Sequence, residues 1–172
     1  MIAFITVGST RFDALIAAIF TSQVLSTFKK KGYTKLTVQC GHSTFKYANE
    51  IKNGETKALD QEGIEIKIWK FKPSLEEEFE KADLVVGHAG SGTILDVLRK
   101  GKAMIVVPNP TLLDNHQVEL AERLEEMEYL IAATVETLPQ AIKRFDTRKT
   151  KPFPPFDGSR FAKIVDEALG FT

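Results

Sequence analysis

A glycine-rich stretch at residues 87–93, Gly-His-Ala-Gly-Ser-Gly-Thr, combines residue types that can hold an anion. It follows an apolar run and precedes a helical pattern, so its backbone amides can converge on an anion at the positive end of a helix dipole. Three residues beyond Thr93, the carboxylate of Asp96 can accept hydrogen bonds from a sugar diol. The candidate binding residues are His88, Ala89, Gly90, Ser91, Gly92, Thr93 and Asp96.

A purely structural explanation of these residues stays open. Thr93 and Asp96 have the spacing of a helix-capping box, which needs no ligand, although such a box does not require three glycines. His88 is either a proton donor to the site or a histidine whose hydrogen bonds are satisfied within its loop. The sequence does not separate these two roles.

A second candidate turn, Gly8-Ser9-Thr10, follows the first apolar run of the chain. Glycine lets backbone approach a ligand, and the two hydroxyls with neighbouring amides can hold phosphate oxygens at the start of a helix. A strand-to-helix turn would also favour these residues for conformational and capping reasons alone. The turn matches neither the dinucleotide fingerprint nor a Walker loop.

A third candidate turn reads Asp-Asn-His-Gln at residues 114–117 and follows an apolar run that ends in Val-Pro. Its carboxylate, amide and imidazole groups suit a polyhydroxylated ligand. The alternative is again a helix cap, with Asp114 as the N-cap residue. Asn115, His116 and Gln117 are the candidate ligand contacts of this turn.

The elements that must position these turns alternate between short apolar runs and longer amphipathic stretches. This alternation predicts an α/β fold with a doubly wound, mostly parallel, Rossmann-like sheet, in which ligands bind at the carboxyl ends of the strands. We expect strands at 3–7, 36–39, 64–71, 84–86, 104–107 and 130–133, and helices at 12–31, 74–81, 93–100, 115–128 and 138–145.

Two regions interrupt the alternation. Residues 43–62 are polar, and we expect a mobile excursion with one short helix near 47–51. From residue 148 three prolines predict an extended segment, and helical periodicity returns over 160–169. We therefore expect a domain at 1–147 and an extension at 148–172, which either binds a partner or packs back on its own domain.

Composition excludes several classes of protein. The 172 residues hold 23 basic and 23 acidic side chains, so no net charge favours nucleic acid. The only cysteine, Cys40, rules out a disulfide framework and fits a reducing compartment, which predicts a cytoplasmic protein. The longest uncharged run, 14–28, is too short and too polar to span a membrane. Gln39-Cys40-Gly41 puts no acidic residue after the second strand, which disfavours a nicotinamide cofactor.

The stretch at 87–123 resembles the donor-binding half of family 28 glycosyltransferases, which are related to the bacterial enzyme that makes lipid II. The whole chain is similar to the cytosolic subunits of two-subunit UDP-N-acetylglucosamine transferases of dolichol-linked oligosaccharide synthesis. This likeness includes Val-Gly-Ser-Thr at 7–10, Lys-Pro-Phe-Pro at 151–154 and the final helix.

The resemblance implies a UDP-N-acetylglucosamine site. The first turn and the glycine-rich loop would hold the diphosphate, Asp96 the ribose hydroxyls, and His116 with Gln117 the donor sugar. It also implies a membrane-anchored partner subunit that binds the lipid-diphosphate-sugar acceptor and supplies the general base, and recruitment of the chain to the cytosolic face of the endoplasmic reticulum.

The implied reaction is transfer of the second N-acetylglucosamine to GlcNAc-diphosphate-dolichol, with inversion. Metal-dependent glycosyltransferases commonly bind the diphosphate through a metal that an Asp-x-Asp motif holds, and this chain has no such motif. We therefore expect no divalent metal, and the resemblance implies no other cofactor. The alternatives are a non-catalytic nucleotide-sugar-binding regulatory module and a nucleotide- or flavin-binding oxidoreductase of the same sheet class.

Overall fold

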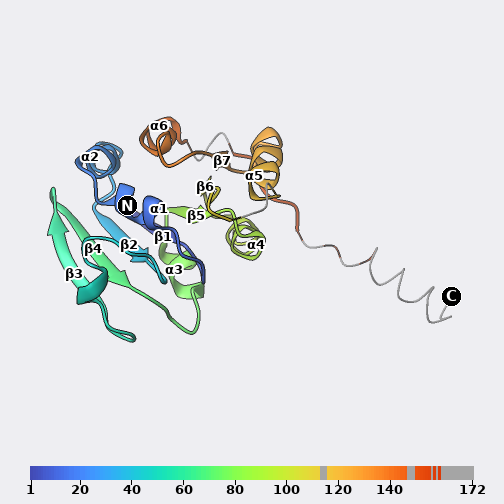
Figure 1. Cartoon of the computed structure of the whole chain (residues 1–172). Helices are drawn as coiled ribbons and strands as arrows, with labels where there is room; N and C mark the ends of the chain where they lie inside the picture. The colour runs from blue at the N-terminus through green and yellow to red at the C-terminus, as the bar shows by residue number, and fades with distance from the viewer. Residues whose placement is uncertain (113–115, 147–149, 156, 158, 160–172) are drawn as a thin grey trace, which may run out of the picture.

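The computed structural model describes residues 1–112, 116–146, 150–155, 157 and 159. Within this part of the chain seven strands form one sheet, in the order β3-β4-β2-β1-β5-β6-β7 (Figure 1). The neighbouring strands pair in parallel except β3 and β4, which are antiparallel. The doubly wound, mostly parallel α/β sheet expected from the sequence is confirmed.

The elements have the following bounds. The strands are β1 (Ile2–Thr6), β2 (Lys35–Gln39), β3 (Lys57–Gln61), β4 (Ile64–Trp69), β5 (Leu84–His88), β6 (Met104–Val107) and β7 (Ile131–Ala132). The helices are α1 (Asp13–Ile19), α2 (Ser22–Lys30), α3 (Glu76–Lys81), α4 (Ser91–Arg99), α5 (His116–Glu126) and α6 (Leu138–Arg144), with a 3-10 turn η1 (Ala48–Glu50).

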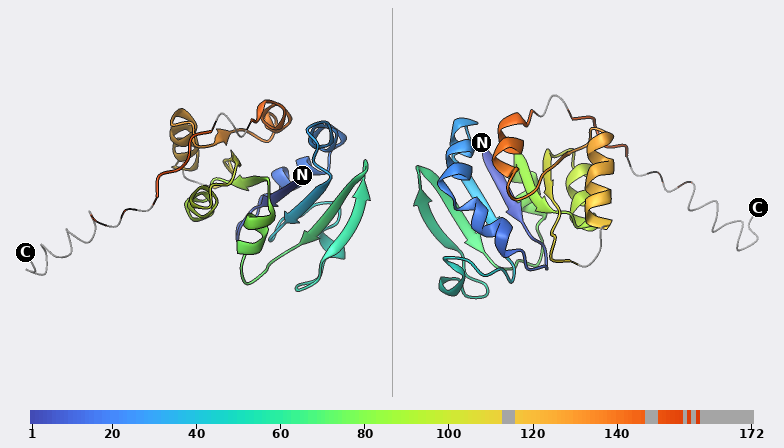
Figure 2. Two further views of the ribbon diagram at one scale, coloured as in Figure 1. Left: turned by 180° about the vertical axis from the view of Figure 1, so that it is seen from behind. Right: turned by 45° about the horizontal axis from the view of Figure 1, so that its top comes forward.

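Helices cover both faces of the sheet (Figure 2). Apolar side chains of α1, α2 and α6 form one core cluster with one face, and those of α3, α4 and α5 form a second cluster with the other face. Every residue of β5 and β6 is buried, as two helix layers require. Because β1, β2, β5 and β6 run parallel, their carboxyl ends meet at one edge, which we call the carboxyl edge.

The helix expected at 12–31 is two helices. α1 ends at Ile19, and α2 begins at Ser22 after Thr21, whose hydroxyl accepts a hydrogen bond from the Val24 amide at 3.4 Å. Thr21 is the N-cap residue of the second helix. The apolar periodicity continues across the junction between the two helices, so the periodicity alone does not reveal where one ends and the other begins.

The excursion expected at 43–62 contains an additional strand, β3, which pairs antiparallel with β4. Glu62 and Gly63 connect the two strands with positive φ angles of 55° and 72°, as in a two-residue hairpin turn. The short helix expected near residue 50 is present as η1. The expectation of an irregular excursion was therefore wrong at its second half.

The extension beyond residue 148 is described only in part. The Lys151 amide donates to the Glu128 carbonyl at 2.8 Å, and the Phe153 ring packs edge-on against Tyr129 with centroids 5.1 Å apart. Residues 151–153 therefore pack on the domain itself. The helix expected at 160–169 lies outside the described residues. Among the described helices, none is long and apolar enough to cross a bilayer.

Candidate functional site

His88 joins two of the three candidate turns. It is the last residue of β5 and is only 6% exposed. A Cβ atom placed on Gly8 would lie 2.8 Å from His88 Cε1, and one on Gly90 would lie 2.4 Å from His88 Nε2. The imidazole therefore lies against the backbone of both the first turn and the glycine-rich loop.

The packing explains two glycines of the site. Gly8, which has a positive φ of 59°, and Gly90 leave room for the His88 ring. A Cβ on Gly92 would meet nothing within 4 Å among the described atoms, and Gly92 is exposed. Gly92 is thus the glycine of this loop whose backbone a ligand can approach.

The protonation state of His88 follows from its burial. Burial lowers the pKa of His88 below its ordinary value of 6.5, and an interaction with the Thr6 backbone offsets part of this effect. The imidazole is therefore neutral at pH 7. Its Nδ1 atom is buried and has no hydrogen-bond partner in the described part of the chain. An unpaired buried nitrogen is rare in folded proteins, and the ring that carries this one lies where the first turn and the glycine-rich loop meet.

The N-terminus of α4 is open to an anion. Gly90 occupies the N-cap position with no side-chain hydrogen bond in the described structure, and the first turn carries no acidic residue. The helix begins at Ser91, so Thr93 lies inside it and the alternative explanation, a capping box of Thr93 with Asp96, does not apply. The first-turn amides and the dipole remain available for negative charge.

Asp96 lines a cavity of about 270 Å³ between α4 and the start of α3. The side chain is exposed, and Thr93 is one helical turn away on the same wall. Ser74 and Leu75 form the opposite wall. This wall was not predicted from the sequence, although the loop after β4 also lies at the carboxyl edge, which is the signal that could have found it.

The third turn is only partly as expected. His116, the first residue of α5, is exposed, with Nδ1 3.9 Å from a carboxylate oxygen of Glu119. Gln117 instead accepts a hydrogen bond from the Asn109 amide at 3.1 Å through Oε1. Asp114 and Asn115 lie outside the described residues, so the structure does not place the expected N-cap or the Asn115 contact.

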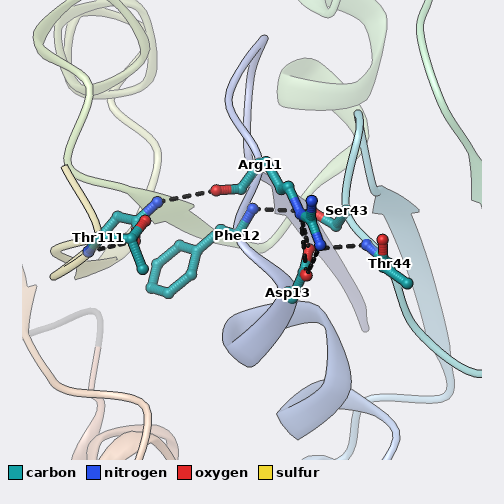
Figure 3. Close-up of polar contacts among 7 residues, drawn as sticks. Arg11, Phe12, Asp13, Ser43, Thr44 and Thr111 are labelled. Atoms are coloured by element: carbon teal, nitrogen blue, oxygen red, sulfur yellow. Dashed lines mark hydrogen bonds and ion pairs between the residues drawn. The ribbon is translucent and has the colours of Figure 1, made fainter.

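The loops after β1, β2 and β6 are tied together by hydrogen bonds (Figure 3). The Phe12 amide donates to Ser43 Oγ at 3.0 Å. Asp13 receives Arg11 Nε at 2.9 Å and the Thr44 amide at 2.8 Å. Hydrogen bonding to Arg11 lowers the pKa of Asp13.

Asn109 completes this connection from the loop after β6. Its Nδ2 donates to the Arg11 carbonyl at 3.0 Å, and its Oδ1 accepts from Thr111 Oγ1 at 2.8 Å. Asn109 is 3% exposed. Hydrogen bonds therefore connect the three loops that border the candidate site.

All buried polar residues of the described chain lie at the carboxyl edge. They are Thr6, Gln39, Ser43, His88 and Asn109. Of these five, His88 was predicted from the sequence as a binding residue, whereas Thr6, Ser43, Asn109 and Gln39 were not. Their common signal is a polar residue at the end of an apolar strand, or just beyond it.

The model of the glycosyltransferase family 28 C-terminal domain matches residues 2–168. The chain belongs to this glycosyltransferase family. The chain is 32% identical to the UDP-N-acetylglucosamine transferase subunit ALG13 of Cryptococcus neoformans, with 97% of this chain and 96% of that protein aligned. It is 39% identical over 135 residues to human ALG13, with 78% of this chain aligned but only 11% of the human protein.

Two solved structures share the fold of this family 28 domain. An NMR structure of ALG13 gives a TM-score of 0.65 at 23% identity, covering 98% of this chain and 96% of that one. The crystal structure of Acinetobacter baumannii MurG gives a TM-score of 0.59 at 18% identity, covering 97% of this chain and 42% of MurG. The chain thus corresponds in fold to a little under half of MurG.

Proposed function

We propose that this chain is the donor-binding subunit of a UDP-N-acetylglucosamine-dependent glycosyltransferase. The observation that carries the proposal is the meeting of the Gly8 turn, the buried His88 ring and the open N-terminus of α4 at one edge of the sheet. The nucleotide sugar is inferred from the ALG13 relatives, which are UDP-N-acetylglucosamine transferase subunits. The chain spans only 11% of the length of the human relative. The activity of the assembled enzyme is therefore also a proposal.

The diphosphate of the donor would bind between the Gly8 turn and the first turn of α4. Backbone amides and the helix dipole attract the anion there, and Gly92 leaves its backbone accessible. His88 is neutral, so it contributes a hydrogen bond rather than a full charge. Charge stabilisation by amides grows as the diphosphate leaves, which is where catalysis needs it.

The nucleoside would bind in the cavity between α3 and α4. Asp96 and Thr93 offer oxygen atoms to the ribose hydroxyls from one wall, and Leu75 offers apolar surface from the other. His116 is exposed at the start of α5 and available to the sugar. Gln117 is engaged with Asn109, so a sugar contact from Gln117 would have to share or replace that hydrogen bond.

The reaction we propose is transfer of N-acetylglucosamine to GlcNAc-diphosphate-dolichol. The acceptor hydroxyl oxygen forms a bond to C1 of the donor sugar from the face opposite the leaving group, the C1–O bond to the diphosphate breaks, and UDP leaves with the electron pair. A base on a membrane-anchored partner subunit takes the hydroxyl proton. Inversion at C1, no metal requirement and recruitment to the cytosolic face of the endoplasmic reticulum are parts of the same proposal.

Asp96→Ala tests the donor site in the assembled enzyme. The chain is co-expressed with candidate membrane partners, and transfer of labelled sugar from UDP-N-acetylglucosamine to a lipid-diphosphate acceptor is followed. Loss of hydrogen bonds from a carboxylate to the ribose should raise the KM for the donor by about tenfold or more. Asp60→Ala, an exposed acidic residue on β3, is the matched control and should behave as wild type.

Two results would contradict the proposal. Normal transfer by Asp96→Ala would remove the α3–α4 cavity as the nucleoside site. UDP-N-acetylglucosamine binding without transfer beside every candidate partner would favour a non-catalytic regulatory module.

A further inference from the structure

Gln39 ends β2 beside the first candidate turn and is 2% exposed. Its Oε1 accepts a hydrogen bond from Thr6 Oγ1 at 2.6 Å and from the Val7 amide at 3.2 Å. Its Nε2 donates to the carbonyls of Gly8 and Lys70, each at 2.8 Å. One buried amide thus uses both ends of its side chain on the loops that follow β1 and β4.

The contacts of Gln39 surround the turn that faces His88. Thr6 Oγ1, which donates to Gln39, also accepts the Gly8 amide at 3.1 Å. Gly8 is therefore held at its amide through Thr6 and at its carbonyl by Gln39 directly. The His88 ring lies against the same residue and leaves no room for a Cβ on Gly8. The direction of the turn is determined by these hydrogen bonds.

The backbone after Gln39 also lies close to the first turn. Gly41 has a positive φ of 53°, and a Cβ placed on it would lie 3.0 Å from the Thr10 carbonyl and 3.2 Å from the Gly8 carbonyl. The two loops therefore touch backbone to backbone. A side chain at position 41 would push the first turn away from its present place.

We propose that Gln39 is a positioning residue for donor binding: its amide fixes the Gly8–Thr10 turn against His88 so that the turn is preorganised for the diphosphate. This inference rests on the proposed function, because it assumes that the turn binds the diphosphate. An apolar side chain of the same size would fill the space but would leave the half-buried Gly8 carbonyl without this donor. A preorganised turn binds an anion without first being ordered, so the residue acts on affinity through the turn.

Gln39→Met tests the positioning role with UDP as the probe. UDP binding to the full chain is measured by calorimetry, together with the melting temperature and the hydrogen exchange of the Val7 and Gly8 amides. We expect the Kd for UDP to rise by about five- to tenfold and exchange at both amides to accelerate. Gln61→Met is the matched control, since Gln61 lies on β3 and donates to the Phe20 carbonyl at 3.1 Å, away from the carboxyl edge.

Gln39→Glu gives a readout that a loss of stability alone would not move. The new carboxylate would face the carbonyls of Gly8 and Lys70, which accept but cannot donate, whereas the protonated carboxyl can donate to one of them. UDP affinity relative to wild type should therefore be lowest at high pH and recover as the pH falls. His88, Cys40 and Lys70 are the nearby titratable groups and are common to both proteins, so the ratio of the two affinities isolates residue 39.

The outcomes separate the two proposals. Failure of the wild-type chain to bind UDP would overturn the proposed function and, with it, the role of Gln39. Wild-type binding with an unchanged Kd in Gln39→Met, or a ratio for Gln39→Glu that does not change with pH, would overturn the positioning role and leave the proposed function in place. An equal loss of affinity in Gln61→Met would show a general effect of stability and would also overturn it.

Discussion

The two ends of the sheet are built by different means. At the carboxyl edge, loops are joined by buried polar side chains such as Gln39 and Asn109, each making three or more hydrogen bonds. At the amino end the connections use exposed groups: the Ile2 amide donates to Asp83 at 2.7 Å, and Lys35 pairs with Glu65 at 3.2 Å. Water can replace the exposed contacts but not the buried ones.

The difference shows that buried polar side chains of the described chain are concentrated at the carboxyl edge. Buried hydrogen bonds contribute little net stability when they form, but their loss is costly because the remaining partner is unsatisfied. A protein that needed only a stable sheet could have closed both ends with surface contacts. The carboxyl edge instead fixes the directions of particular backbone groups, which is what a binding site requires.

Substitution of Gly90 should give the largest effect at the carboxyl edge. In Gly90→Ala the new Cβ would lie 2.4 Å from Nε2 of the buried His88, so the ring or the loop would have to shift. We expect a loss of roughly 2–3 kcal/mol in the free energy of unfolding, measured with urea, and loss of UDP binding. The control is Gly92→Ala, where the Cβ meets open space within a helix and should preserve or raise stability. An equal loss of unfolding free energy in the two variants would contradict the packing of Gly90 against His88.

Asn109 and Asp83 compare the two ends directly. Asn109→Ala removes a buried amide that holds the Arg11 carbonyl, so we expect a loss of about 1–2 kcal/mol. Asp83→Ala removes one exposed hydrogen bond to the Ile2 amide and should cost less, because water can replace it. Urea unfolding of both variants measures the difference. A larger loss in Asp83→Ala would contradict the distinction between the two ends.

The pH dependence of stability should give the smallest effect. The pKa of His88 is lower in the folded chain than its unfolded value of 6.5, so the unfolded state binds the proton more readily. Stability should therefore be fully present above about pH 6.5 and should decrease as the pH falls below that value. Melting temperatures of the wild type and of His88→Gln between pH 7.5 and 5.5 test this expectation. The slope in this range should be smaller in the variant, and equal slopes would assign it to other groups.

The sequence predicted the central sheet well because its strands carry a strong signal. Runs such as Met104–Val107 are apolar at every position, which only a strand between two helix layers requires. The strand-end rule then located the first turn and the glycine-rich loop correctly. Strand β3 was not predicted, because it alternates half-buried and exposed residues and has little apolar content. Its pairing depends on β4 and on the Glu62-Gly63 turn.

The site could be predicted in position but not in its internal contacts. Sequence spacing left a capping box at Thr93 open as an alternative, but the helix begins earlier, at Ser91. The ligand contact predicted for Gln117 stays a prediction, and spacing did not reveal that Gln117 accepts a hydrogen bond from the Asn109 amide. These partners are distant in sequence or depend on where a helix starts within one or two residues. The contacts of Gln39 were hidden for the same reason, since its Nε2 bonds the loops that follow two other strands.

The antiparallel strand β3 also covers β4, which would otherwise be an edge of the sheet. Without it, β4 would be the outer strand of the sheet, and its alternating Ile64, Ile66 and Ile68 would lie beside unpaired backbone. Such an edge is a template for pairing with another chain. β3 instead presents a five-residue edge that bears Lys57 and Asp60 and no buried residue. The hairpin thus protects the sheet against edge-to-edge aggregation.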